Sequence, residues 1–117
     1  MVQEQRRAFA TDTYDRVGAE RLLGLLSSGT LLAQGPMGSM LMSEFCAQDI
    51  PAAYWNVAEP QEVTRIHRLY MDAGAQVAIT NTFQASAPAL ERDGIESSVK
   101  LVCAEAVACA HAAGARN

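Results

Sequence analysis

Two short polar segments of the chain carry residue types that could bind a small ligand. Gln34–Ser39 follows one apolar run, and Thr80–Ser86 follows a second. Glycines in the first segment let the backbone approach a ligand closely and expose N–H groups to a carboxylate. Hydroxyl and amide groups in the second can hold a small polar molecule. Taken singly, the segments are also compatible with a glycine-rich turn and a polar loop.

The apolar runs before these segments predict buried strands, and the rest of the pattern predicts helices. Glu59–Ala73 is the clearest helix, because Pro60 suits its first position and Val63, Ile66, His67 and Tyr70 form one apolar face. Ser97 is the expected cap of the last helix. The expected order is a helix at 15–26, a strand at 30–34, a short helix at 40–46, a loop at 47–58, a helix at 59–73, a strand at 76–80, a loop at 81–87, a turn near residue 90 and a helix from 97 to 113.

Strands that alternate with helices predict an α/β fold with parallel pairing. A complete (β/α)₈ barrel takes about 250 residues, whereas this chain has 117. We therefore expect the opening β/α units of a TIM barrel, that is, an incomplete barrel. Residues 1–12 are expected to be a flexible tail, and residues 13–117 the domain. Sites in such barrels lie at the C-terminal ends of the strands, where both polar segments fall.

Composition narrows the classes of partner. The net charge is −4 with no basic stripe, which argues against nucleic acid. Apolar runs are too short to cross a membrane, and no apolar segment follows the charged N-terminus, so a cytoplasmic location is expected.

We predict structural roles for the cysteines and histidines. Cys46, Cys103 and Cys109 show no disulfide or metal spacing, so we expect small core side chains and no metal site. His67 is expected in the core, as are Tyr70 and Trp55, and His111 is expected at an exposed helix end.

The order of motifs between the two polar segments resembles the homocysteine S-methyltransferase family, which includes betaine–homocysteine methyltransferase and the first module of cobalamin-dependent methionine synthase. That family opens with Asp-Gly-Gly-Met-Gly-Thr and continues with a Trp, a Pro-Glu-Val helix containing Ile-His-x-x-Tyr, an Ala-Gly-Ala end and a Thr-Asn-Thr-Phe strand end. The matching residues here are Gln34–Ser39, Trp55, Pro60–Val63, Ile66–Tyr70, Ala73–Ala75 and Thr80–Phe83.

The resemblance implies a (β/α)₈ barrel that transfers a methyl group to the thiol of homocysteine, giving methionine. It also implies a zinc ion held by three later cysteines, which this chain does not match, so no cofactor is expected in this chain. Gln34 replaces the family aspartate, and Pro36 removes an N–H donor. The implied substrate-binding residues are Gln34, Gly35, Gly38, Asn81, Thr82 and Phe83.

Three hypotheses remain open. The first is a family methyltransferase that needs further segments or a complementing chain. The second is a non-catalytic binding or interaction module derived from this fold, for which exposed strand edges would favour a homo-oligomer. The third is an unrelated α/β enzyme with the same opening topology. The methyl donor does not follow from the sequence.

Overall fold

The computed structural model describes residues 16–45 and 50–116, and a division into two compact units falls between Leu31 and Leu32. In the first unit, α2 (Arg16–Ser27) confirms the first predicted helix to within one residue. Its apolar side chains are exposed, including Val17 and Leu23 at 77% and 64%. The predicted tail at residues 1–12 lies outside the described residues.

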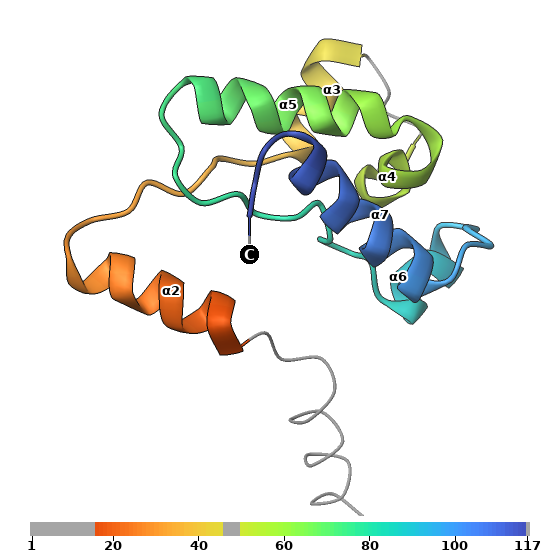
Figure 1. The fold of residues 1–117 in the computed structure, drawn as a ribbon. Helices are drawn as coiled ribbons and strands as arrows, with labels where there is room; N and C mark the ends of the chain where they lie inside the picture. Colours follow the sequence, from red (N-terminus) through yellow and green to blue (C-terminus); the bar gives the residue numbers. More distant parts are fainter. Residues whose placement is uncertain (1–15, 46–49, 117) are drawn as a thin grey trace, which may run out of the picture. The chain divides into compact units, whose positions relative to one another are not determined.

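The second unit is small and mostly helical (Figure 1). The clearest predicted helix is confirmed as α5 (Pro60–Asp72), with Pro60 at its start. It contacts α7, α4 and α3. The remaining helices are α3 (Gly38–Phe45), the 3₁₀ helix η1 (Ala52–Tyr54), α4 (Trp55–Ala58), α6 (Ala87–Arg92) and α7 (Val99–Ala112).

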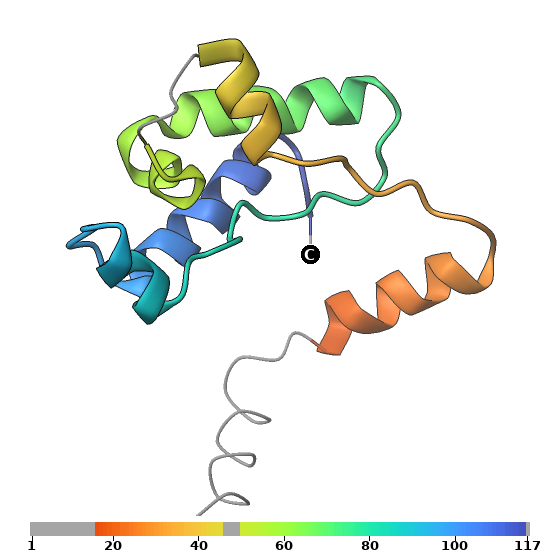
Figure 2. The same ribbon diagram turned by 180° about the vertical axis from the view of Figure 1, so that it is seen from behind.

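The prediction of strands at 30–34 and 76–80 is wrong. The described residues contain no strand and therefore no complete β/α unit. Within the second unit, residues 32–34 and 76–80 run side by side in extended form, as both views show (Figures 1 and 2), and one parallel bridge joins Ala33 to Val77. Leu32 O accepts from Gln76 N at 2.7 Å, and Gln34 N donates to Val77 O at 2.9 Å. A parallel pair needs further neighbours to become a stable sheet, which explains why the ladder stays this short.

Three other boundaries differ from prediction. The loop expected at 47–58 contains η1 and α4 in its described part, because Ala53, Trp55 and Asn56 are buried against the rest of the unit. The turn near Leu90 is a short helix, α6. The last helix is capped by Ser98, whose Oγ accepts from Leu101 N at 3.1 Å, and not by Ser97.

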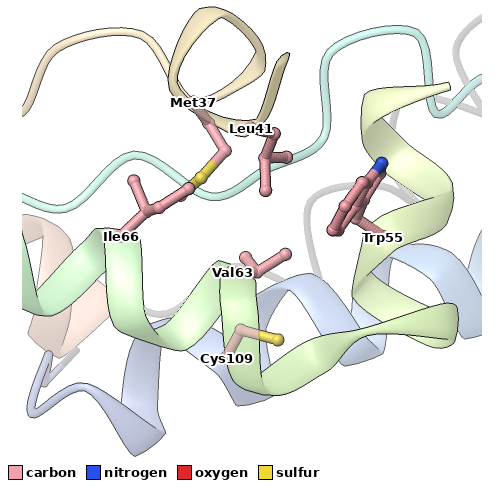
Figure 3. Packing of buried hydrophobic residues seen from close by; sticks show 6 residues of the cluster. All are labelled: Met37, Leu41, Trp55, Val63, Ile66 and Cys109. Carbon is pink, nitrogen blue, oxygen red and sulfur yellow. The ribbon is translucent and has the colours of Figure 1, made fainter. Parts of the chain in front are cut away.

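The core lies between these helices. Its larger cluster, shown in Figure 3, brings together side chains from α3 and the residue before it, α4, α5 and α7: Met37, Leu41, Trp55, Val63, Ile66 and Cys109. A second cluster joins Ala53, Ala85, Leu90 and Val102. Buried apolar side chains of α5 and α7 thus contribute to the packing that stabilises this unit. None of the helices in the described ranges is long and apolar enough to cross a membrane.

Candidate functional site

A cavity of about 1040 Å³ lies where the two extended segments end. The carboxyl end of the first segment leads into α3, and that of the second leads toward α6. The wall of the cavity is formed by Gln34–Ser39, Leu41, Met42, Ile50–Ala52, Trp55, Ile79–Asn81, Phe83, Gln84 and Asp93. Five of the six predicted substrate-binding residues line this cavity, namely Gln34, Gly35, Gly38, Asn81 and Phe83, and Thr82 is not among the lining residues.

The side chain of Gln34 is held by a hydrogen bond to His67 of α5. This side chain is only 6% exposed, and its Oε1 lies 2.8 Å from Nδ1 of His67. His67 is fully buried, as its place on the apolar face of the helix predicted. Burial lowers the pKa of this imidazole below its ordinary value of 6.5, so the neutral form is favoured.

The glycine-rich turn is held close to Tyr70. The phenol of Tyr70 donates to the carbonyl of Pro36 at 2.7 Å. A Cβ on Gly35 would lie 2.9 Å from Cε1 and Oη of Tyr70, closer than side chains normally approach. A side chain at position 35 would therefore displace the aromatic ring that packs against the turn. Tyr70 is half-buried at the edge of the larger cluster, in agreement with its predicted structural role.

Asn81 is part of a buried amide network. Its Nδ2 donates to Ala52 O at 2.7 Å and to Asn56 Oδ1 at 2.9 Å. Asn56 Nδ2 donates in turn to Asn81 O at 2.7 Å and to Val102 O at 3.3 Å. Asn56 was not predicted as a site residue, because it lay in an expected loop. This network fixes the end of the second segment against η1 and α7.

The rest of the second segment is less enclosed. Phe83 is 81% exposed at the cavity wall. Gln84 has a φ of 63°, the left-handed region that non-glycine residues seldom adopt. Thr82 N donates to Thr80 O at 2.8 Å, and the hydroxyls of these two residues lie 3.2 Å apart. The threonines therefore shape the turn that presents Phe83.

Asp93 is a lining residue that sequence reasoning missed. It follows α6, and its carboxylate accepts from Nε and Nη2 of Arg92 at 3.0 and 3.1 Å. These hydrogen bonds hold the pKa of the Asp93 carboxyl below its ordinary value. A carboxylate is thus present at the cavity wall, and no motif in the sequence distinguishes it from other acidic residues at helix ends.

The thiols that the structure describes lie in different parts of the core. Cys109 belongs to the larger cluster and Cys103 packs against the second. Burial raises the pKa of the Cys109 thiol, which disfavours the thiolate that a metal would need. Within residues 16–45 and 50–116, no three His, Cys, Asp or Glu side chains gather as a metal site. Cys46 lies outside the described residues.

Comparison with known proteins identifies one family. The family model described as homocysteine S-methyltransferase matches residues 31–117, which is more than two thirds of the chain and includes every residue of the cavity wall. Neither the curated proteins nor the solved structures give a match.

Proposed function

Because the chain belongs to the homocysteine S-methyltransferase family, we propose that its cavity binds homocysteine, the thiol of which receives a methyl group to give methionine. The observation that carries this proposal is the meeting of both predicted polar segments at one cavity. Buried apolar side chains of Leu41 and Trp55 form one part of the wall and suit the methylene groups of the substrate. Polar groups on the other parts suit its amino-acid end. The proposed contacts are Gln34, Gly35, Gly38, Asn81 and Phe83, with Thr82 shaping the turn beside them.

The start of α3 is the part of the wall best suited to the substrate carboxylate. The helix begins at Gly38, and Gly38 and Ser39 both line the cavity. The first N–H groups of a helix have no acceptor within the helix, and the helix dipole favours negative charge there. A carboxylate placed at this end would accept hydrogen bonds from the backbone.

Asp93 is the group best suited to the substrate ammonium. The family has an aspartate where this chain has Gln34, so the negative charge must come from elsewhere in the wall. Asp93 supplies an ionised carboxylate at the cavity. An ion pair with bound substrate would restore the charge complementarity that position 34 lacks.

Two further features of the family are proposals for this chain. The parallel bridge between Ala33 and Val77 supports the view that the extended segments correspond to neighbouring strands of a (β/α)₈ barrel. The described thiols do not fit a zinc site, because Cys103 and Cys109 pack into separate clusters. Methyl transfer would need residues outside the described ones or a complementing chain.

Calorimetric titration with L-homocysteine tests the proposal. We expect the same affinity with and without added zinc, and about tenfold weaker binding for Asp93→Asn, since a hydrogen bond to a charged group is lost. Glu91→Gln is the matched control, because it removes an exposed carboxylate two residues away that does not line the cavity. Absence of homocysteine binding would refute the proposed function, and strictly zinc-dependent binding would refute our reading of the thiols.

A non-catalytic interaction module is the second candidate function. The observation in its favour is the exposure of large apolar side chains, with Leu32 and Ile79 on the extended segments at 56% and 54% and Phe83 in the following turn at 81%. Such side chains, beside strand edges with few ladder bonds, can pair with a second chain. Light scattering after size exclusion distinguishes this candidate, which predicts a dimer or larger assembly; a compact monomer over a wide concentration range would count against it.

A further inference from the structure

The buried pair formed by His67 and Gln34 has one short hydrogen bond and one unpartnered atom. His67 Nδ1 lies 2.8 Å from Gln34 Oε1. The other ring nitrogen, Nε2, is buried and has no hydrogen-bond partner among the described residues. A neutral imidazole carries one proton, so the position of that proton decides which atom of the pair donates.

The unpartnered nitrogen decides between the two tautomers. A proton on Nε2 would leave a buried N–H donor without an acceptor, which is rare in folded proteins, whereas an unpaired acceptor is tolerated more often. The Nδ1–H tautomer avoids that donor, and its proton is donated to Gln34 Oε1 at the observed 2.8 Å. The lowered pKa of His67 agrees with a neutral ring carrying a single proton.

This tautomer fixes the direction of the Gln34 carboxamide. With Oε1 engaged by His67, the NH₂ group is the polar end that remains. Its contact within the protein is Gly35 O at 3.5 Å, the outer limit of a hydrogen bond. Gln34 is more than nine-tenths buried and yet lines the cavity, so a ligand is the natural partner of this donor.

We propose that His67 is a positioning residue, which holds the Gln34 carboxamide so that its NH₂ group donates a hydrogen bond to an oxygen of the ligand carboxylate. This inference rests on the proposed function for the identity of the ligand and deepens it. Gln34 would thereby bind the carboxylate of the amino acid, and Asp93 would bind its ammonium group. An acceptor side chain at position 34 would select the opposite end.

The tautomer can be measured without any ligand. In ¹⁵N-labelled protein, two-dimensional NMR spectra correlate the imidazole nitrogens with the protons on the imidazole carbons. The nitrogen chemical shifts show which ring nitrogen is protonated. The chain has two histidines, and His111→Asn removes the exposed one, which assigns the remaining signals to His67. We expect Nδ1–H at neutral pH. A proton on Nε2 would overturn the inference, because Gln34 would then have to turn its NH₂ group toward His67.

The ligand contact is tested with L-homocysteine, 4-sulfanylbutanoate, which lacks the amine, and 3-aminopropane-1-thiol, which lacks the carboxylate. His67→Leu should weaken binding of both carboxylates by about tenfold and leave the amine unchanged. His67→Asn, whose amide can donate from nearly the same place as Nδ1–H, should bind as the wild type does. His67→Leu combined with Gln34→Leu should be no weaker than Gln34→Leu alone.

The outcomes separate this inference from the function on which it rests. An equal loss for all three ligands in His67→Leu, or no recovery in His67→Asn with the fold intact by circular dichroism, would reduce His67 to a packing role. If the wild type bound 4-sulfanylbutanoate but not homocysteine, the proposed substrate would be wrong while the carboxylate contact stood. Binding of neither carboxylate would overturn both.

Discussion

Two buried polar pairs flank the cavity, and they differ in how completely they are hydrogen-bonded. Asn56 and Asn81 share a bond at 2.9 Å, and their amide groups also donate to backbone carbonyls, two of them at 2.7 Å. His67 and Gln34 share one short bond, and Nε2 of the ring has no partner within residues 16–45 and 50–116. A satisfied network stabilises and rigidifies, while a partly satisfied pair retains hydrogen-bonding capacity for something else. The first pair therefore stabilises the fold, whereas the Gln34 NH₂ group of the second pair, with its long 3.5 Å contact to Gly35 O, keeps a hydrogen-bond donor at the cavity wall.

Replacing Asn56 and His67, the members of the two pairs that do not line the cavity, by leucine should give the largest difference in the free energy of unfolding. Asn56→Leu removes the donor to Asn81 O, the acceptor of Asn81 Nδ2 and the side-chain bond to Val102 O, and should lower the free energy of unfolding by about 3 kcal/mol. His67→Leu removes a ring nitrogen that has no partner among the described residues, but it also leaves the buried Gln34 Oε1 without its donor, so the loss should be smaller, about 1.5 kcal/mol. Urea unfolding followed by circular dichroism measures both.

Gln61→Ala is the control for these two variants, because it removes an exposed amide from α5 and should change stability by about 0.5 kcal/mol at most. Equal losses for Asn56→Leu and His67→Leu would erase the distinction between the pairs.

The glycine-rich turn next to Gln34 gives the second contrast. Gly35→Ala places a Cβ 2.9 Å from the Tyr70 ring and should cost about 2 kcal/mol, because the ring must move and its bond to Pro36 O is strained. Gly38→Ala, three residues on in the same segment, meets Ala52 Cβ at an ordinary 3.6 Å and should be nearly neutral. Thermal unfolding of the two variants compares them directly.

In the Tyr70→Leu background, Gly35→Ala should cost little relative to Tyr70→Leu alone, because the atoms in conflict are gone. An equal cost of Gly35→Ala in both backgrounds would mean that Gly35 is required for a reason other than Tyr70.

What the sequence predicts here follows from local patterns. The helical spacing of Val63, Ile66 and His67 correctly placed the imidazole in the core, and the family motifs correctly indicated the family. The two polar segments were expected at one edge because parallel neighbours end together, and they do line one cavity.

The missed features depend on contacts between distant parts of the chain. Nothing local pairs His67 with a residue 33 positions away, or gives Asn56 its partners at Asn81 and Val102. The strands were overpredicted because an apolar run becomes a strand only where neighbours complete its ladder, and the described residues supply one bridge. Asp93 reaches the cavity only through the position of α6.

Removal of the N-terminal cap of α7 should have the smallest effect among these variants that still involves the Asn56–Asn81 network. Ser98 accepts from Leu101 N, and its carbonyl accepts from Val102 N, so it fixes the turn from which Val102 O meets Asn56. Ser98→Ala should therefore lower the free energy of unfolding by about 1 kcal/mol. Ser97→Ala is the matched control, because the sequence alone favoured Ser97 as the cap although the structure assigns that bond to its neighbour. Hydrogen exchange of Leu101 N–H should accelerate in Ser98→Ala and not in Ser97→Ala; the reverse result would restore the cap to Ser97 and detach this turn from the Asn56–Asn81 network.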